Sequence, residues 1–145
     1  MSRVSVKVDG IEELMADLSK LGKISDDLVV DTLNDLVMDT QANAVRGIQR
    51  GPASGRTYKR GTVTHKASAP GQFPMSDTGR LAANVEFEVA NKSRKVAVVG
   101  TNIQYGAYLE FGTSKMAARP WLMPSFRKAS EGVAKELKAK LEGRM

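Results

Sequence analysis

The sequence of 145 residues contains no cysteine and only one histidine, His65. Without cysteine there are no disulfides or thiolate metal ligands, so a stapled secreted fold is disfavoured and a reducing cytoplasm suits the chain. A single histidine excludes paired-imidazole metal sites and leaves a serine–histidine hydrolase dependent on that one residue. We therefore predict no catalytic, metal-binding or cofactor-binding site. A hydrolase that uses His65 is an alternative for which the sequence suggests no substrate.

Long apolar runs are also missing. Residues 1–8 alternate polar and apolar side chains and lack the apolar stretch of a signal peptide. No later window approaches the roughly 18 apolar residues that a membrane span requires. We expect a protein that is soluble when made and has no membrane partner. With 41% hydrophobic and 26% charged residues, the composition predicts one domain over residues 1–145.

Acidic residues are absent between Thr40 and Ser76, whereas six basic residues lie there. The formal net charge of the whole chain is +6, so its positive excess belongs to this segment. A local basic surface of this kind suits phosphate, an acidic partner or an acidic neighbouring subunit. The six residues are Arg46, Arg50, Arg56, Lys59, Arg60 and Lys66.

Apolar spacing predicts a strand and two helices in the N-terminal part of the chain. Residues 3–8 alternate as a half-buried strand does, and residues 11–21 follow the spacing of an amphipathic helix. A longer helix is expected from Asp26 to about Gln49, with its acids early and its arginines late, as the helix dipole favours. Its expected inward stripe is Leu28, Val29, Leu33, Leu36, Val37, Thr40, Ala44, Val45 and Ile48.

Glycine and proline punctuate residues 51–75, which show little apolar periodicity. We predict a long loop here, with a weak extended piece around residues 62–64. Connections of this length are usually functional or become ordered on binding. Tyr58 beside Lys59 could stack on nucleic acid, but the segment has one aromatic near its charges and no recognition-helix pattern. The sequence therefore shows no pattern that would recognise specific bases.

The C-terminal half predicts short elements followed by a closing helix. A capped helical turn is expected at residues 77–81, and a β-hairpin from strands at 84–89 and 96–99, ended by Gly100. A short helix is expected at 103–111, with Tyr105, Tyr108 and Leu109 on one side. The last helix should begin near Pro120 to Pro124, with Leu122, Phe126, Val133, Leu137 and Leu141 facing inward.

These elements predict an α+β fold in which a small antiparallel β-sheet packs against α-helices, with one long basic loop. Strand 96–99 is the more apolar of the two hairpin strands, so it should lie centrally in the sheet. Residues 3–8 can join the same sheet. Glu110 lies among aromatic residues, where a buried carboxylate needs a partner. Arg119 is the nearest candidate for an ion pair, while an intersubunit partner and an outward-facing glutamate are the alternatives.

Two stretches carry a family resemblance. The first is Ser68-Ala69-Pro70-Gly71-Gln72-Phe73-Pro74, followed by residues 77–81, Asp-Thr-Gly-Arg-Leu. The second is residues 105–113, Tyr-Gly-Ala-Tyr-Leu-Glu-Phe-Gly-Thr, followed by residues 118–122, Ala-Arg-Pro-Trp-Leu. Together they resemble the minor tail, or tail-completion, proteins of long-tailed bacteriophages. The motif residues expected to matter for structure are Pro70, Gly71, Asp77, Gly79, Leu81, Tyr105, Tyr108, Glu110, Phe111, Gly112, Arg119 and Pro120.

The resemblance implies a structural virion protein without enzyme activity, assembled in the host cytoplasm at the head–tail junction. It implies a homo-oligomeric ring, commonly a hexamer, whose partners are the tail tube protein and the head–tail connector or stopper protein. Genomic DNA would pass nonspecifically through the lumen. Tail terminator and neck adaptor stay alternatives.

Within such a ring the loop would face either the lumen or a neighbouring protein. Its candidate contact residues are Arg56, Tyr58, Lys59, Arg60, His65 and Lys66. The rival hypothesis is a free, nonspecific DNA-binding protein that uses the basic segment 46–66.

Overall fold

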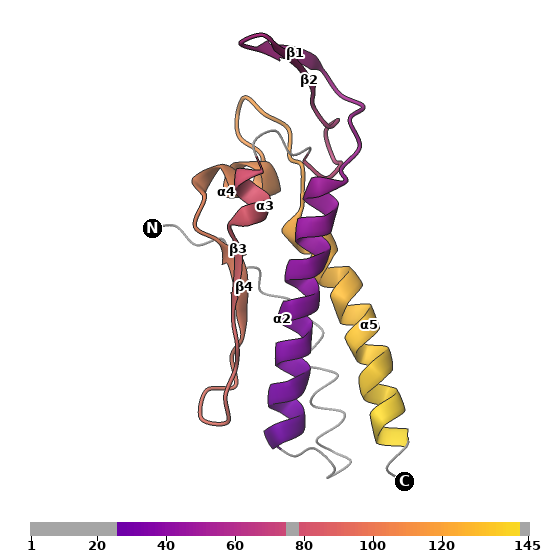
Figure 1. Cartoon of the computed structure of the whole chain (residues 1–145). Coiled ribbons are helices and arrows are strands. Elements are labelled where there is room, and N and C mark those ends of the chain that lie inside the picture. The colour runs from indigo at the N-terminus through magenta and orange to yellow at the C-terminus, as the bar shows by residue number, and fades with distance from the viewer. Residues whose placement is uncertain (1–25, 75–78, 143–145) are drawn as a thin grey trace.

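The computed structural model describes residues 26–74 and 79–142 of the chain (Figure 1). The predicted strand at 3–8 and helix at 11–21 lie outside these residues. The described elements are α2 (Asp26–Gln49), β1 (Thr57–Arg60), β2 (Val63–Lys66), α3 (Arg80–Ala83), β3 (Val85–Glu88), β4 (Val98–Thr101), α4 (Gln104–Phe111) and α5 (Leu122–Glu142).

The predicted α+β class is confirmed. Strands β1 and β2 form one two-stranded antiparallel sheet, and β3 and β4 form another. In Figure 1 helix α2 runs through the middle, with α5 along one side and the β3–β4 hairpin along the other. Within the described residues β4 pairs with β3 alone. The expected larger sheet would include residues 3–8, which lie outside the described residues, so that expectation stays a prediction.

Helix α2 follows its predicted bounds because its apolar residues recur at helical spacing. Its buried residues, which all belong to the predicted stripe, are Leu28, Leu36, Val37, Thr40, Ala44 and Ile48. Polar side chains of α2 reach the β3–β4 hairpin. Asn34 accepts the Ala90 N–H at 2.7 Å, and Gln41 Nε2 donates to the Val85 carbonyl at 3.0 Å. The sheet side of α2 is thus fixed by hydrogen bonds as well as by apolar packing.

Two ion pairs join the far end of the hairpin to the first turn of α2. Lys92 Nζ lies 2.8 Å from Asp27, and Lys95 Nζ lies 2.6 Å from Asp26. The hydrogen bond and charge of Lys95 lower the pKa of Asp26, and those of Asp27 raise the pKa of Lys92. Exposed pairs of this kind contribute little stability, so their main effect is on orientation.

Three predicted boundaries were wrong in detail. The helical turn expected at 77–81 begins at Arg80, because Gly79 has a φ of 75° and stands before the first helical residue. The second strand was expected at 96–99, ended by Gly100, yet it begins at Val98 and continues to Thr101, which pairs with Val85. Val89, expected to face inward with Val85, is exposed, because β3 ends at Glu88.

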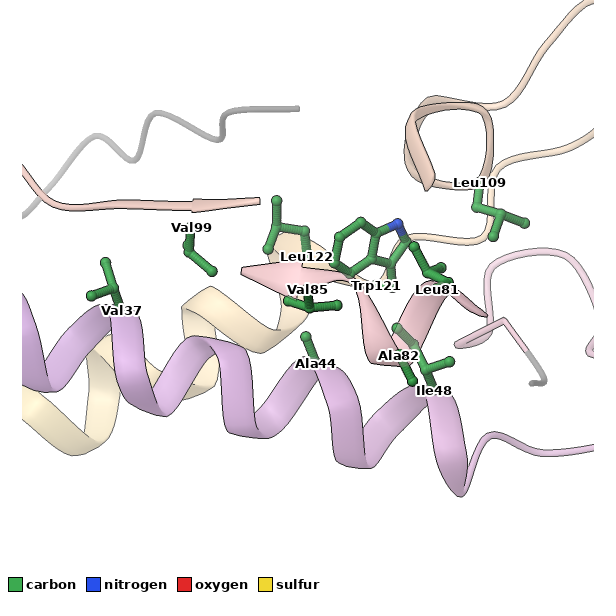
Figure 2. Packing of buried hydrophobic residues seen from close by; sticks show 10 residues of the cluster. All are labelled: Val37, Ala44, Ile48, Leu81, Ala82, Val85, Val99, Leu109, Trp121 and Leu122. Atoms are coloured by element: carbon green, nitrogen blue, oxygen red, sulfur yellow. The ribbon is translucent and has the colours of Figure 1, made fainter. Parts of the chain in front are cut away.

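The core lies where α2, α3, β3, β4 and α4 meet the beginning of α5 (Figure 2). Trp121 is fully buried at its centre, and its indole Nε1 donates to the Gly106 carbonyl at 2.8 Å. A second cluster joins α2 to α5 and consists of Leu36, Phe126, Ala129 and Val133. The predicted inward residues Leu122, Phe126, Val133 and Leu137 are buried, while the Leu141 side chain lies outside the described ones.

We expect Gly106→Ala to destabilise the fold. A Cβ atom there would lie 2.7 Å from Thr101 Cγ2 and 3.0 Å from Leu81 Cδ1, both in the core. Overpacking of this kind costs about 1–3 kcal/mol. The matched control is Gly132→Ala in α5, where a Cβ would meet nothing within 4 Å. That substitution should stabilise the helix by about 0.5–1 kcal/mol. Urea unfolding of both variants checks the prediction, and equal effects would contradict it.

Candidate assembly surface

The β1–β2 hairpin is the part of the described chain that stands apart from the core. It projects beyond the C-terminal end of α2, away from the other elements (Figure 1). Residues 51–75 were predicted as a long loop with an extended piece at 62–64. The extended piece is confirmed as part of β2, whereas β1 was not predicted, and Gly61, with a φ of 63°, closes the antiparallel hairpin that the two strands form. The two strands are held together by backbone pairing, which the apolar periodicity of the sequence did not indicate.

The register gives the hairpin two different faces. Tyr58 pairs with His65, and their rings stack with centroids 5.7 Å apart and an interplanar angle of 27°. Lys59 pairs with Thr64, and Thr57 pairs with Lys66. Because cross-strand partners share a face and successive residues alternate, Lys59 and Lys66 lie on the face opposite the Tyr58–His65 stack. We call the side with Thr57, Lys59, Thr64 and Lys66 the basic face.

The charges of the hairpin are presented to solvent. Arg56, Lys59 and Lys66 are exposed, as are Tyr58 and Val63, whereas His65 is half-buried against Tyr58. Arg60 ends β1 opposite Val63. A cationic, partly aromatic projection of this kind can bind a negatively charged protein surface or phosphate groups.

The two strands of the hairpin leave the rest of the chain through a narrow stem. The Gly55 N–H donates to the Ala67 carbonyl at 2.7 Å, and the Ala67 N–H donates to the Arg56 carbonyl at 2.9 Å. A Cβ at Gly55 would lie only 2.3 Å from the Ser68 carbonyl oxygen, so this close approach requires glycine. The hairpin is therefore attached by backbone bonds that leave its outer part free of the core.

Glu110 lies at the base of this region and is buried. Its carboxylate accepts three backbone N–H groups at the start of α5: Trp121, just before the helix, at 2.7 Å, Leu122 at 2.8 Å and Met123 at 3.0 Å. The N-terminus of a helix carries unsatisfied donors and partial positive charge, which a carboxylate complements. The predicted ion pair with Arg119 and the outward-facing alternative were therefore both wrong.

Arg119 instead joins the two motif stretches. Its Nε donates to the Ser68 carbonyl at 3.1 Å, and its backbone N–H donates to the Leu109 carbonyl at 2.6 Å. Nearby, the Gly71 N–H donates to the Ala118 carbonyl at 2.9 Å. Residues as far as 51 positions apart along the chain thus meet in one place, at the foot of the hairpin stem. We call Glu110, Arg119 and these bonded backbone groups the motif junction.

The other motif residues fall in different environments. Leu81 is in the core and Gly112 ends α4 with a φ of 75°, which glycine accommodates. Pro70 is exposed and Pro120 is half-buried. Asp77 lies outside the described residues.

The aromatic side chains of α4 point outward, so the prediction that Tyr105 and Tyr108 lie on the same side as Leu109 was wrong. Leu109 is buried, whereas Tyr105, Tyr108 and Phe111 are 57%, 43% and 71% exposed. The inward face is set by Gly106, which allows close contact with the core, and by Glu110 one turn later, which reaches α5. Exposed aromatic side chains on one short helix are typical of protein contact sites. They extend the candidate assembly surface beyond the hairpin.

A comparison with protein families gives a match over residues 12–112, more than two thirds of the chain, to the bacteriophage HK97 gp10-like family of tail components. The chain belongs to this family. It is therefore a bacteriophage tail component, which acts within the virion together with other virion proteins. No curated protein and no solved structure matches the chain. The matched region contains the hairpin, its stem and α4, and it ends at Gly112.

The described part of this tail component shows neither a cluster of metal ligands nor a membrane-spanning helix. Among the described residues, no three His, Asp or Glu side chains gather as metal ligands would. In the same part of the chain, no helix combines the length and apolar character needed to cross a membrane.

A row of acidic residues on one side of α2 was not predicted from the sequence. Asp31, Asp35 and Asp39 are four residues apart and therefore share one side of the helix. Met38, 49% exposed, lies beside them. The four-residue spacing was visible in the sequence, but the early acids of α2 were interpreted only as complements of the helix dipole. We call Asp31, Asp35, Met38 and Asp39 the α2 ridge.

We expect Glu110→Ala to weaken folding by about 2–3 kcal/mol, because it leaves buried N–H groups of α5 without an acceptor. Glu110→Gln keeps one acceptor oxygen and should lose less. The control, Glu131→Ala on the exposed side of α5, should stay within about 0.5 kcal/mol of the wild type. Denaturant unfolding measures all three. A Glu110→Ala protein as stable as the control would show that the cap is energetically unimportant.

Proposed function

We propose that this tail component is a ring-forming tail-completion or tail-terminator protein, or a neck component of the same fold, that joins the tail tube to the head connector. The observation that carries the proposal is the β1–β2 hairpin, which projects from the motif junction and exposes cations and aromatic side chains. An isolated two-stranded hairpin has marginal stability in water. A neighbouring subunit that pairs or packs with it would supply the missing contacts.

The arrangement of the exposed features supports a ring. The hairpin and the aromatic side of α4 are different surfaces, and head-to-tail association uses two different surfaces of each subunit. When the rotation between subunits closes, such association produces a ring. We propose a hexamer whose partners are the tail tube protein and the head–tail connector or stopper protein.

The proposed role is structural and involves no enzyme activity. Basic residues turned toward the lumen would meet the phosphates of exiting DNA without reading its sequence. Membership of a tail-component family favours this role over that of a free DNA-binding protein.

The direct test combines the purified chain with purified tail tubes of its own phage. Electron microscopy should show rings at one end of the tubes, and native mass spectrometry of the released rings should give the subunit number. Tubes whose ends carry no copies, together with a chain that stays monomeric beside them, would refute the proposal.

We expect a variant in which residues 57–66 are replaced by Asn-Gly to fold but not to form rings. Arg56 and Ala67 are joined by a hydrogen bond at the stem, so a tight turn can connect them. Its unfolding free energy should stay within about 1 kcal/mol of the wild type, because the hairpin stands apart from the core. Sedimentation velocity with tail tubes measures association.

The control for this variant is a Gly-Ser segment of equal length in place of residues 57–66. It preserves the spacing of the chain but removes the strand pairing and the charges, and it should also fail to assemble. Normal rings from either variant would contradict the assigned role of the hairpin.

A further inference from the structure

Charge is separated along α2 and the segment that follows it. Five carboxylates and no lysine or arginine lie between Asp26 and Asp39. Six basic residues and no carboxylate lie between Thr40 and Ser76. Because α2 is one continuous helix, the acidic and basic parts of each subunit lie at opposite ends of a rod. Such a subunit is electrostatically complementary to a second copy placed head to tail with it.

The α2 ridge is the solvent-facing side of the acidic half. Asp31 and Asp39 are exposed, Asp35 between them is half-buried, and Met38 adds an apolar side chain to the same surface. The remaining sides of α2 are occupied: Asn34 and Gln41 bond to the β3–β4 hairpin, and Leu36 packs against Phe126 of α5. Asp26 and Asp27 are paired with lysines of the same chain. The ridge lies just beyond these pairs.

The basic face matches the ridge in length and chemistry. Eight residues of helix separate Asp31 from Asp39, which corresponds to about 12 Å. A four-residue strand extends about 13 Å, so Lys59 and Lys66 can meet carboxylates of successive helical turns. The aliphatic stems of the two lysines can cover Met38 while their ammonium groups reach the aspartates.

The hairpin cannot make this contact within its own chain. It projects beyond the C-terminal end of α2, whereas the ridge lies in the N-terminal half of that helix (Figure 1). From Asp39 to Gln49 the helix alone covers about 15 Å in the direction of the hairpin. The complementary surface must therefore come from another molecule.

We infer that the basic face of the β1–β2 hairpin of one copy docks on the α2 ridge of the next copy. The inference rests on the proposed ring and names the surface that receives the hairpin. Lys59 and Lys66 pair with Asp31 and Asp39 of the neighbour, and the opposite face, with Tyr58 and His65, is left for the lumen or for a third partner. The contact is head to tail, so every subunit gives one hairpin and receives one.

The experiment uses two full-length variants with opposite charge reversals. Lys59→Glu with Lys66→Glu has an acidic hairpin and an acidic ridge, and Asp31→Lys with Asp39→Lys has a basic hairpin and a basic ridge. Each variant alone should associate at least tenfold more weakly than the wild type, at about 0.05 M salt, because like charges meet. An equal mixture should recover assembly, since each hairpin then meets a ridge of opposite charge in alternating order.

Sedimentation velocity and native mass spectrometry measure the assemblies, and the mixed ones should contain both variants in equal number. The matched control reverses two exposed lysines of α5, Lys128→Glu with Lys135→Glu, and should assemble as the wild type does. Circular dichroism verifies that every variant is folded.

Several results would overturn the inference. Variants that assemble alone as the wild type does, or a mixture that stays dissociated, would show that the hairpin docks elsewhere. Nucleic acid as the true occupant would appear as DNA retention lost in the lysine variant and not restored by mixing. A wild type that stays monomeric at low salt would also refute this contact, while the ring itself is judged separately by the tail-tube experiment. Rings on tubes from both unmixed variants would leave the proposed function intact and remove only this interface.

Discussion

The rest of the structure depends on one interaction: the buried carboxylate of Glu110, a residue of α4, accepts hydrogen bonds from the backbone at the start of α5. It satisfies the N–H groups of Trp121, Leu122 and Met123, which begin the helix beside the most buried part of the core. A helix end placed there without an acceptor would leave several polar groups buried and unpaired. Because Glu110 belongs to α4, the same cap also holds α4 against α5 and brings its aromatic side chains to the surface.

The motif junction connects this core to the projecting hairpin. Arg119 donates to Ser68 at the foot of the stem, and Gly71 donates to Ala118. The direction in which the hairpin leaves the molecule is therefore set by the same few residues that begin α5. A rigid foot and an exposed outer part suit an arm that a neighbouring subunit receives, since little conformational entropy is lost in aiming it. In the proposed ring, the charge separation along α2 would supply a surface of the opposite sign on the next copy.

Much of the fold could be predicted from the sequence because periodicity reports burial directly. The bounds of α2 followed from its apolar stripe, and the start of α5 followed from the prolines around Trp121. The β1–β2 hairpin could not be found in this way, because both of its faces are largely exposed and no alternation of burial marks its strands. The partner of Glu110 was missed for a related reason. Sequence proximity favoured Arg119, whereas the acceptors that the fold required were backbone groups, which no residue type reveals.

The central claim is that the hairpin is an intersubunit arm received by α2 of the adjoining protomer in the virion. Cryo-electron microscopy of the mature tail at side-chain resolution tests it most directly. The account predicts density for a ring at the tube end in which Lys59 and Lys66 of each subunit lie within ion-pairing distance of Asp31 or Asp39 of the next. A ring whose hairpins touch no neighbouring protomer, or a tail without this protein, would contradict it.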